Sequence, residues 1–219
     1  MYNYRQFRLI MPLVILTGLT LTLQQAFAQY PGFRAIDRVA EFKNKFSNEA
    51  KTIQSIKSNF IQEKHLSVLE ETILSEGHFW FKRENKVRIE YVKPFRYLLL
   101  MNGDQIVVRD ENKENRMNTK SNKLFQQVNH VIVDCVQGTI LENKSFSNRL
   151  FQNDTMELLE ITPLSQALKD FFETIIVMVD KKNNSVSTID LREPGGDHTL
   201  LRFTAKELNT KLNDEIFTH

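Results

Sequence analysis

The stretch VRIEY at residues 87–91 indicates the fold most clearly, because apolar and charged residues alternate along it without an exception. Successive side chains of a β-strand point to opposite faces, so this pattern predicts a strand with one buried and one solvated face. Pro94 ends the strand. The preceding stretch EGHFWFKR at 76–83 predicts a neighbouring strand, with Phe79 and Phe81 on one face.

Outward from this pair, the chain continues as strands joined by short turns. The apolar runs at 97–101 and 105–109 are joined by NGD at 102–104, where asparagine and glycine tolerate positive φ, and together they predict a hairpin. Strands connected by tight turns pair in the antiparallel direction. Further strands are predicted at 56–62, 115–118, 156–162, 174–179, 185–192 and 199–208.

Three segments have the period of an amphipathic helix instead. Apolar groups recur at intervals of three and four residues over 33–46 and again over 122–137, where we expect the helix to end before Gly138. A short third helix is expected at 164–172. The sequence therefore predicts an α+β fold, in which amphipathic helices cover one side of a single curved antiparallel sheet.

The first 28 residues have the features of an export signal. Arg5 and Arg8 precede an apolar run at 9–23, and AFA at 26–28 matches the small-x-small cleavage pattern. The run is shorter than the roughly 20 apolar residues of a membrane span. We therefore expect a cleaved signal at 1–28 and one exported domain at 29–219. Residues 1–28 contain two arginines and no acid, so cleavage lowers the net charge from +2 to 0, which argues against a nucleic-acid partner.

Patterns typical of catalytic and metal sites are missing from the sequence. The five histidines have no metal-ligand spacing with one another or with Cys135, the only cysteine, and no Gly-x-Ser-x-Gly elbow occurs. Helical periodicity puts Cys135 on the apolar face of the helix at 122–137, which indicates a buried structural thiol. We therefore expect no enzymatic activity, no metal and no cofactor.

The order of these motifs resembles the LolA family of outer-membrane lipoprotein carriers. In that family a strand of the form Gly-x-hydrophobic-Trp-hydrophobic-Lys-Arg is followed by a short aromatic strand, a proline, and a hydrophobic hairpin closed by Asp/Asn-Gly. Residues 77–83, 87–91, Pro94 and 98–103 supply these elements in the same order. Glu84 stands where many members have a proline, which indicates a divergent branch.

The resemblance implies a half-barrel whose concave face is apolar and closed by helices, with acyl chains held between sheet and lid. It implies a periplasmic chaperone that takes acylated lipoproteins from an inner-membrane ABC-type release complex to an outer-membrane acceptor; we expect a monomer. By strand alternation, we assign to the acyl-chain-binding concave face Phe60, Phe79, Phe81, Val87, Ile89, Tyr91, Leu98, Leu100, Ile106 and Val108. The expected lid residues are Leu124, Val128, Val131 and Ile132, and the family places an arginine at the position of Arg83 in hydrogen bonds to the lid.

Two other functions fit the same fold. A regulatory domain would bind lipidated proteins to report envelope stress, and a carrier of another amphiphile would hold a glycolipid or a polyketide-like pigment precursor. For Arg83 the alternative is a solvated residue at a strand end, since arginine is mostly exposed. For the apolar stripes the alternative is an ordinary core without a cavity, since protein interiors are densely packed.

Overall fold

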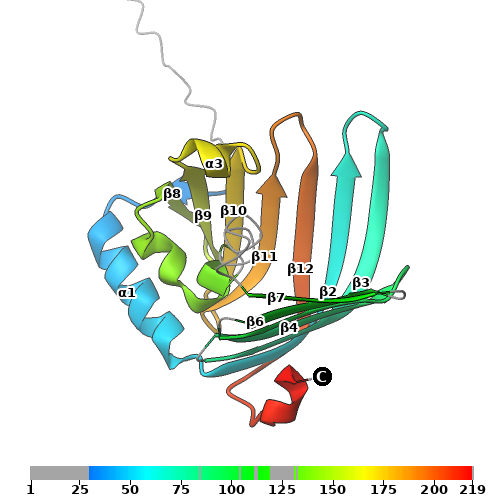
Figure 1. The fold of residues 1–219 in the computed structure, drawn as a ribbon. Coiled ribbons are helices and arrows are strands. Elements are labelled where there is room, and N and C mark those ends of the chain that lie inside the picture. The colour runs from blue at the N-terminus through cyan, green and yellow to red at the C-terminus, as the bar shows by residue number, and fades with distance from the viewer. Residues whose placement is uncertain are drawn as a thin grey trace, which may run out of the picture.

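The computed structural model describes residues 30–83, 85–103, 105–110, 113–118, 131 and 133–218. Its strands form one open, fully antiparallel sheet in the order β1-β8-β9-β10-β11-β12-β2-β3-β4-β5-β6-β7. The sheet is strongly bent and forms a trough (Figure 1). The strands are β1 Arg34–Ala35, β2 Ser55–Leu66, β3 Glu71–Lys82, β4 Lys86–Lys93, β5 Tyr97–Asn102, β6 Gln105–Asp110, β7 Glu114–Asn118, β8 Phe146–Gln152, β9 Met156–Pro163, β10 Thr174–Asp180, β11 Ser185–Arg192 and β12 His198–Leu208.

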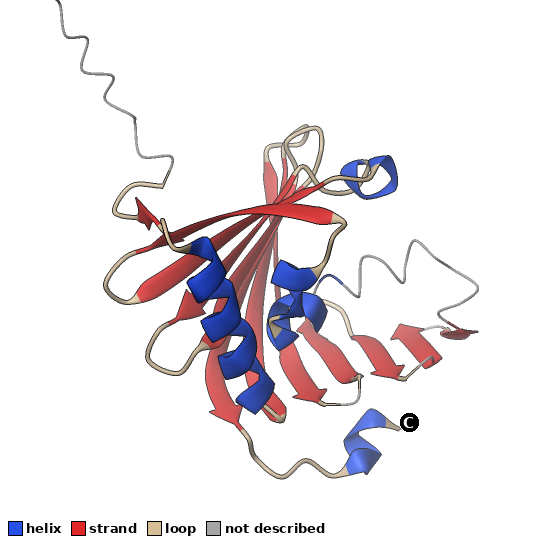
Figure 2. Cartoon of the chain, turned by 90° about the vertical axis from the view of Figure 1, so that its left-hand side faces the viewer, coloured by secondary structure: helices blue, strands red, loops and turns tan. Residues whose placement is uncertain are grey.

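Helical elements lie on both sides of this sheet. Helix α1 (Val39–Thr52) lies in the trough beside a second helical segment that includes residues 133–137 and the 3₁₀-helix η2 (Thr139–Glu142), as Figure 2 shows. The short helix α3 (Gln166–Lys169) follows β9. The C-terminal 3₁₀-helix η3 (Asp214–Phe217) lies on the outer side and contacts β4 and β5. The predicted α+β fold, a curved antiparallel sheet with helices on its concave face, is confirmed.

The predicted strands are all present, whereas the first helix begins later than expected and the third, expected at 164–172, comprises only Gln166–Lys169. Residues 34–35 form β1, which pairs with β8 at the sheet edge, and α1 begins only at Val39. Gly32 adopts a φ of +80° before this stretch, so the chain turns onto the sheet edge before it coils. The apolar side chains at the start of the predicted helix therefore belong to an extended segment.

Strand β8 was not predicted. Its sequence FSNRLFQ has apolar residues at the first, fifth and sixth positions, which is neither the strand period nor the helix period. The reason is that both faces are partly apolar: Leu150 faces the core, while Phe151 on the other face packs against Tyr30 with a ring-centroid distance of 5.1 Å. The tyrosine hydroxyl also donates a hydrogen bond to Glu160, at 2.6 Å.

Candidate functional site

The concave face of the sheet carries one continuous apolar surface. The register pairs Phe79 with Ile89 and Phe81 with Val87, and directly paired residues of antiparallel strands project on the same face. One buried cluster connects this face from β9 to β6. The predicted residues in that cluster are Phe60, Phe79, Phe81, Val87, Ile89 and Ile106, and Tyr91 and Val108 are partly buried against it.

The expectation that Leu98 and Leu100 share this face is wrong. The register pairs Leu100 with Arg88, so both project from the convex face, and Leu98, Leu100 and Val107 form a separate small cluster there. The run YLLLM at 97–101 does not alternate, and a shift of one residue moves every side chain of a strand to the other face. On β2, β5 and β12, further concave-face residues that were not predicted are Ile56, Leu99, Met101, Leu201 and Phe203.

Helix α1 and the second helical segment cover the concave face. Phe42 and Phe46 of α1 stack with their ring centroids 5.8 Å apart and enter the apolar cluster. Val131 and Cys135 of the second segment are buried in the same cluster, and burial raises the pKa of the Cys135 thiol. The other expected lid residues, Leu124, Val128 and Ile132, lie outside the described residues.

The two covering elements touch each other at Gly138, which ends the helical turn at 133–137. Gly138 has a φ of +74°, and a Cβ atom built on it would lie 2.4 Å from the Cβ of Ala50 on α1. Real Cβ atoms do not approach so closely. Glycine is therefore required here both for its backbone conformation and for its lack of a side chain.

Arg83, at the end of β3, fastens the C-terminal end of α1. Its Nε donates to the carbonyl oxygen of Ile53 at 2.8 Å, and a terminal guanidinium nitrogen donates to that of Ala50 at 2.6 Å. The last carbonyls of a helix lack intrahelical partners and carry partial negative charge, so a guanidinium suits them. Arg83 is thus a half-buried latch at the C-terminal end of α1, not a solvated residue, and its described side-chain acceptors are Ala50 and the C-cap residue Ile53, not residues of the segment at 122–137.

Two further polar contacts fasten the middle of α1. Ser47 donates a hydrogen bond to Glu142 of η2 at 2.5 Å, and Lys45 lies 4.0 Å from Glu157 on β9. Glu157 is buried among concave-face residues, and desolvation raises the pKa of its carboxyl group although Lys45 lowers it. The covering helix is therefore held by apolar packing and by a few discrete polar contacts.

Tyrosines form the rim of the covered region at the far end of β4 and β5. Tyr91 packs edge-on against Phe60 at 5.0 Å and against Tyr97 at 5.7 Å between centroids. The Tyr91 hydroxyl donates to the side-chain oxygen of Gln62 at 2.7 Å, and burial raises its pKa to about 12. These groups have an apolar body toward the core and a polar tip, a composition that suits the mouth of an apolar site.

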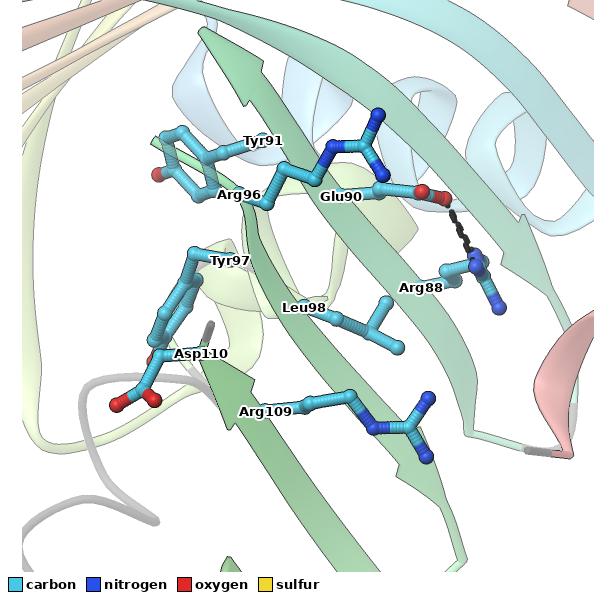
Figure 3. Close-up of a pocket in the computed structure, with 8 residues that line it drawn as sticks. All are labelled: Arg88, Glu90, Tyr91, Arg96, Tyr97, Leu98, Arg109 and Asp110. Carbon is cyan, nitrogen blue, oxygen red and sulfur yellow. Dashed lines mark hydrogen bonds and ion pairs between the residues drawn. The ribbon is translucent and has the colours of Figure 1, made fainter. Parts of the chain in front are cut away.

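A groove of about 400 Å³ opens at this same end of the sheet. Figure 3 shows that the guanidinium groups of Arg88, Arg96 and Arg109 extend to one side of the strands, whereas Tyr91 and Tyr97 extend to the other. The sheet end therefore separates a convex surface of arginines, two of them paired with carboxylates, from the aromatic rim of the concave one.

The sequence of this chain matches that of a known protein family. Residues 51–219 match the family described as "Outer membrane lipoprotein carrier protein LolA". The chain belongs to the LolA family. The match covers every concave-face residue of β2 to β6 and the Arg83 latch.

Two curated relatives share the family name at low identity. Outer-membrane lipoprotein carrier proteins of Chromohalobacter salexigens and Cupriavidus pinatubonensis are 24% and 29% identical to the chain over 147 and 159 residues. The matches cover 66% and 68% of this chain and the same shares of the relatives, about two thirds of each. The fold is also similar to that of an uncharacterized conserved protein from Thermus thermophilus, at 8% identity and a TM-score of 0.51, over 83% of this chain and 94% of that one.

Neither a membrane-crossing helix nor a metal-ligand cluster occurs among the described residues. None of their helices combines the length and the apolar character that crossing a bilayer requires. They also contain no group of three or more His, Cys, Asp or Glu side chains arranged to hold a metal ion.

Proposed function

We propose that this protein is a periplasmic carrier that shields the acyl chains of lipoproteins between the concave face and its helical cover. The observation that carries the proposal is the unbroken apolar surface from β9 to β6, covered by a helix that a few polar contacts hold in place. Each methylene removed from water contributes about 0.8 kcal/mol, so a multiply acylated protein needs such a surface to cross an aqueous compartment. No covalent chemistry is required.

The described arrangement corresponds to the closed carrier. Phe60, Phe81 and Val87 are almost fully buried beneath the cover, so an acyl chain reaches them only when α1 or the second segment moves away. Arg83 is the natural control point, because its two bonds to the end of α1 break when that helix lifts. The apolar face then exchanges its contacts with the helices for contacts with the cargo.

The partners and the cellular route belong to the same proposal. The acyl-chain-binding residues are the concave-face members of the predicted set, and Val131 and Arg83 serve the lid. The signal at 1–28 directs export, the inner-membrane ABC-type complex loads the carrier, and an outer-membrane acceptor unloads it. Family membership supports these steps.

The test compares two buried positions on opposite faces of neighbouring strands. Ile89→Asn places an amide on the concave face, and Leu98→Asn does the same on the convex face at similar burial. Binding of a fluorescent triacylated lipopeptide is measured for the folded fraction of each variant. We expect Ile89→Asn to lose most binding and Leu98→Asn to keep it; equal losses would contradict the proposal.

A second measurement identifies the cargo. The protein is purified from the periplasm, and co-purified apolar species are identified by mass spectrometry. Triacylated peptides are the expected finding. Free glycolipids would assign the concave face to another amphiphile.

A further inference from the structure

The loop between β4 and β5 presents an aromatic side chain to solvent beside two cations. Phe95 is 72% exposed and Val92 is 39% exposed. Lys93 and Arg96, which alternate with them in the sequence VKPFR at 92–96, are exposed as well, and Lys93 lies 3.0 Å from Glu76 in an ion pair. An apolar tip flanked by basic residues is the composition that binds the interface of bilayers with anionic headgroups.

On the convex side of this sheet end, arginines and carboxylates line a groove next to the loop. The guanidinium groups of Arg88, Arg96 and Arg109 lie along the groove at the base of the loop (Figure 3). Arg88 is paired with Glu90 and Arg109 with Glu114. Arg96 forms no ion pair or hydrogen bond with any residue that the structure describes, so its guanidinium has its donors available for a ligand.

We propose that this loop docks the protein on a bilayer that contains anionic phospholipids, with Phe95 inserted among the headgroups and Arg96 at a lipid phosphate. The phenyl ring supplies apolar area, and the guanidinium supplies paired hydrogen bonds to a phosphate. One ring and a few cations give weak, reversible binding, which suits a protein that must leave the membrane again.

A second exposed apolar site differs in its charge. At the tip of the β2–β3 hairpin, Val68 and Leu69 are 89% and 66% exposed, so they are at least as available as Phe95. Glu70 and Glu71 follow them directly in the sequence. An anionic membrane repels that tip and attracts the β4–β5 loop, which is why the proposal selects the latter.

The position of the loop connects docking with the proposed carrier function. Only this step of the inference rests on that function. Arg96 directly precedes Tyr97, whose ring packs on Tyr91 at the rim of the covered apolar region. Insertion of Phe95 therefore brings this rim to the membrane surface. An acyl chain that leaves the concave face there does so at the membrane, where the proposed acceptor unloads the carrier.

The experiment measures vesicle binding by flotation. The protein is purified as the host exports it, with its N-terminus determined by mass spectrometry, so that the apolar run at 9–23 does not contribute. Vesicles contain phosphatidylethanolamine and phosphatidylglycerol, or phosphatidylcholine alone. The variants are Phe95→Ser, Arg96→Glu and the matched control Leu69→Ser, all at exposed positions.

We expect the wild type to bind the phosphatidylglycerol vesicles and to lose binding at high salt. Phe95→Ser lowers the partition coefficient about tenfold, in line with lost burial of a phenyl ring. Arg96→Glu lowers it about thirtyfold on anionic vesicles alone, because charge reversal removes one attraction and adds one repulsion of about 1 kcal/mol each. Leu69→Ser leaves it unchanged.

Two results would overturn the proposal. Absence of wild-type binding to either vesicle excludes membrane docking and leaves the loop to a protein partner. If Leu69→Ser weakens vesicle binding as much as Phe95→Ser does, the binding is general apolar adhesion and does not depend on the β4–β5 loop. Lipopeptide binding is measured in parallel without vesicles, and Phe95→Ser is expected to retain it. A failure of docking is thus distinguished from a failure of the carrier function.

Discussion

The two faces of strands β2 to β4 are both covered, but their covers are fastened in different ways. On the concave face, α1 inserts Phe42 and Phe46 into the apolar cluster and is latched at its end by Arg83. On the convex face, residues 209–217 form a strap with polar contacts along its whole length. Its partners are Gln54 and Ser55 near the start of β2, Lys82 on β3, and Lys86 and Arg88 on β4.

In the proposed carrier, this difference makes α1 the cover that opens and the strap the cover that stays in place. Breaking the strap requires the loss of hydrogen bonds to the carbonyls of Thr210, Leu212 and Ile216, together with exposure of Phe217. Lifting α1 breaks a smaller number of polar contacts, and the apolar area that it uncovers is available for an acyl chain. Cargo binding therefore offsets the cost of opening on one face only.

The largest expected effect comes from removal of the strap's anchor. Phe217 is 2% exposed, and Phe217→Ala should cost about 3–5 kcal/mol of unfolding free energy, as for other buried phenylalanines. Urea denaturation measures this cost. Lipopeptide binding by the folded fraction should be unchanged, because the ring lies on the convex side. A loss below about 1 kcal/mol would show that the strap is not a structural cover.

Gly138, at the contact between the two concave covers, should have the next largest effect. Gly138→Ala combines the cost of a positive φ with the close approach to Ala50, and we expect a loss of about 2–3 kcal/mol. The matched control is Gly103→Ala in the β5–β6 turn, where φ is +59° and nothing lies within 4 Å of an added Cβ. Gly103→Ala should cost about 1 kcal/mol. Thermal unfolding of both variants measures the difference, which should disappear if the covers do not touch.

Arg83→Leu should affect exchange of cargo more than stability. It removes two hydrogen bonds to the end of α1, so we expect a stability loss of about 1–3 kcal/mol and a faster release of bound lipopeptide. Arg88→Leu is the control, because Arg88 donates in a similar way to the carbonyl of Ile216 in the strap. Its loss should lower stability without a change in release, which stopped-flow fluorescence measures. Unchanged release from Arg83→Leu would refute the latch.

The sequence predicted the sheet well because alternation is a local property of each strand. The strand at 87–91 lies within β4, and the strand at 76–83 matches the second half of β3, which begins earlier at Glu71; the apolar side chains of both lie on the predicted face. The run at 97–101 shows the limit of this approach, since three successive leucines do not indicate a face and only pairing with β4 determines it. For the same reason Leu98 and Leu100 were assigned to the wrong side.

Long-range contacts were beyond prediction from the residues alone. The family resemblance predicted a latch at Arg83, but its described partners on α1 lie about thirty residues earlier and only the fold brings them together. The strap had no apolar period to mark it, because backbone carbonyls supply several of its hydrogen bonds. Phe95 gave no signal either, since one aromatic residue after a proline reads as an ordinary turn.

The smallest expected effect distinguishes the two buried glutamates of β9, one on each face. Glu157 on the concave side has a raised pKa, so folding disfavours its charged form. The resulting loss of folding stability is complete at pH values above the native pKa. It disappears as the pH falls to 4.5, the pKa of this carboxyl group in the unfolded chain, because the native state binds the proton at a higher pH than the unfolded chain does. Glu157→Gln should therefore raise the unfolding midpoint at about pH 7 and leave it unchanged at about pH 4.

Glu160, on the convex face, is the matched control for this substitution. It accepts hydrogen bonds from Tyr30 at 2.6 Å and from the Nε of Arg149 at 2.8 Å, so its charge is compensated. Glu160→Gln weakens these charge-assisted bonds and should lower the midpoint at about pH 7. Shifts of opposite sign in the unfolding midpoint would show that the carboxylate of Glu157 is buried under the concave cover at a cost in stability. They would also show that the carboxylate of Glu160 stabilises the segment packed over it. Shifts of the same sign would show that the two faces do not differ in this electrostatic respect. Only the Arg83 latch and the strap would then distinguish them.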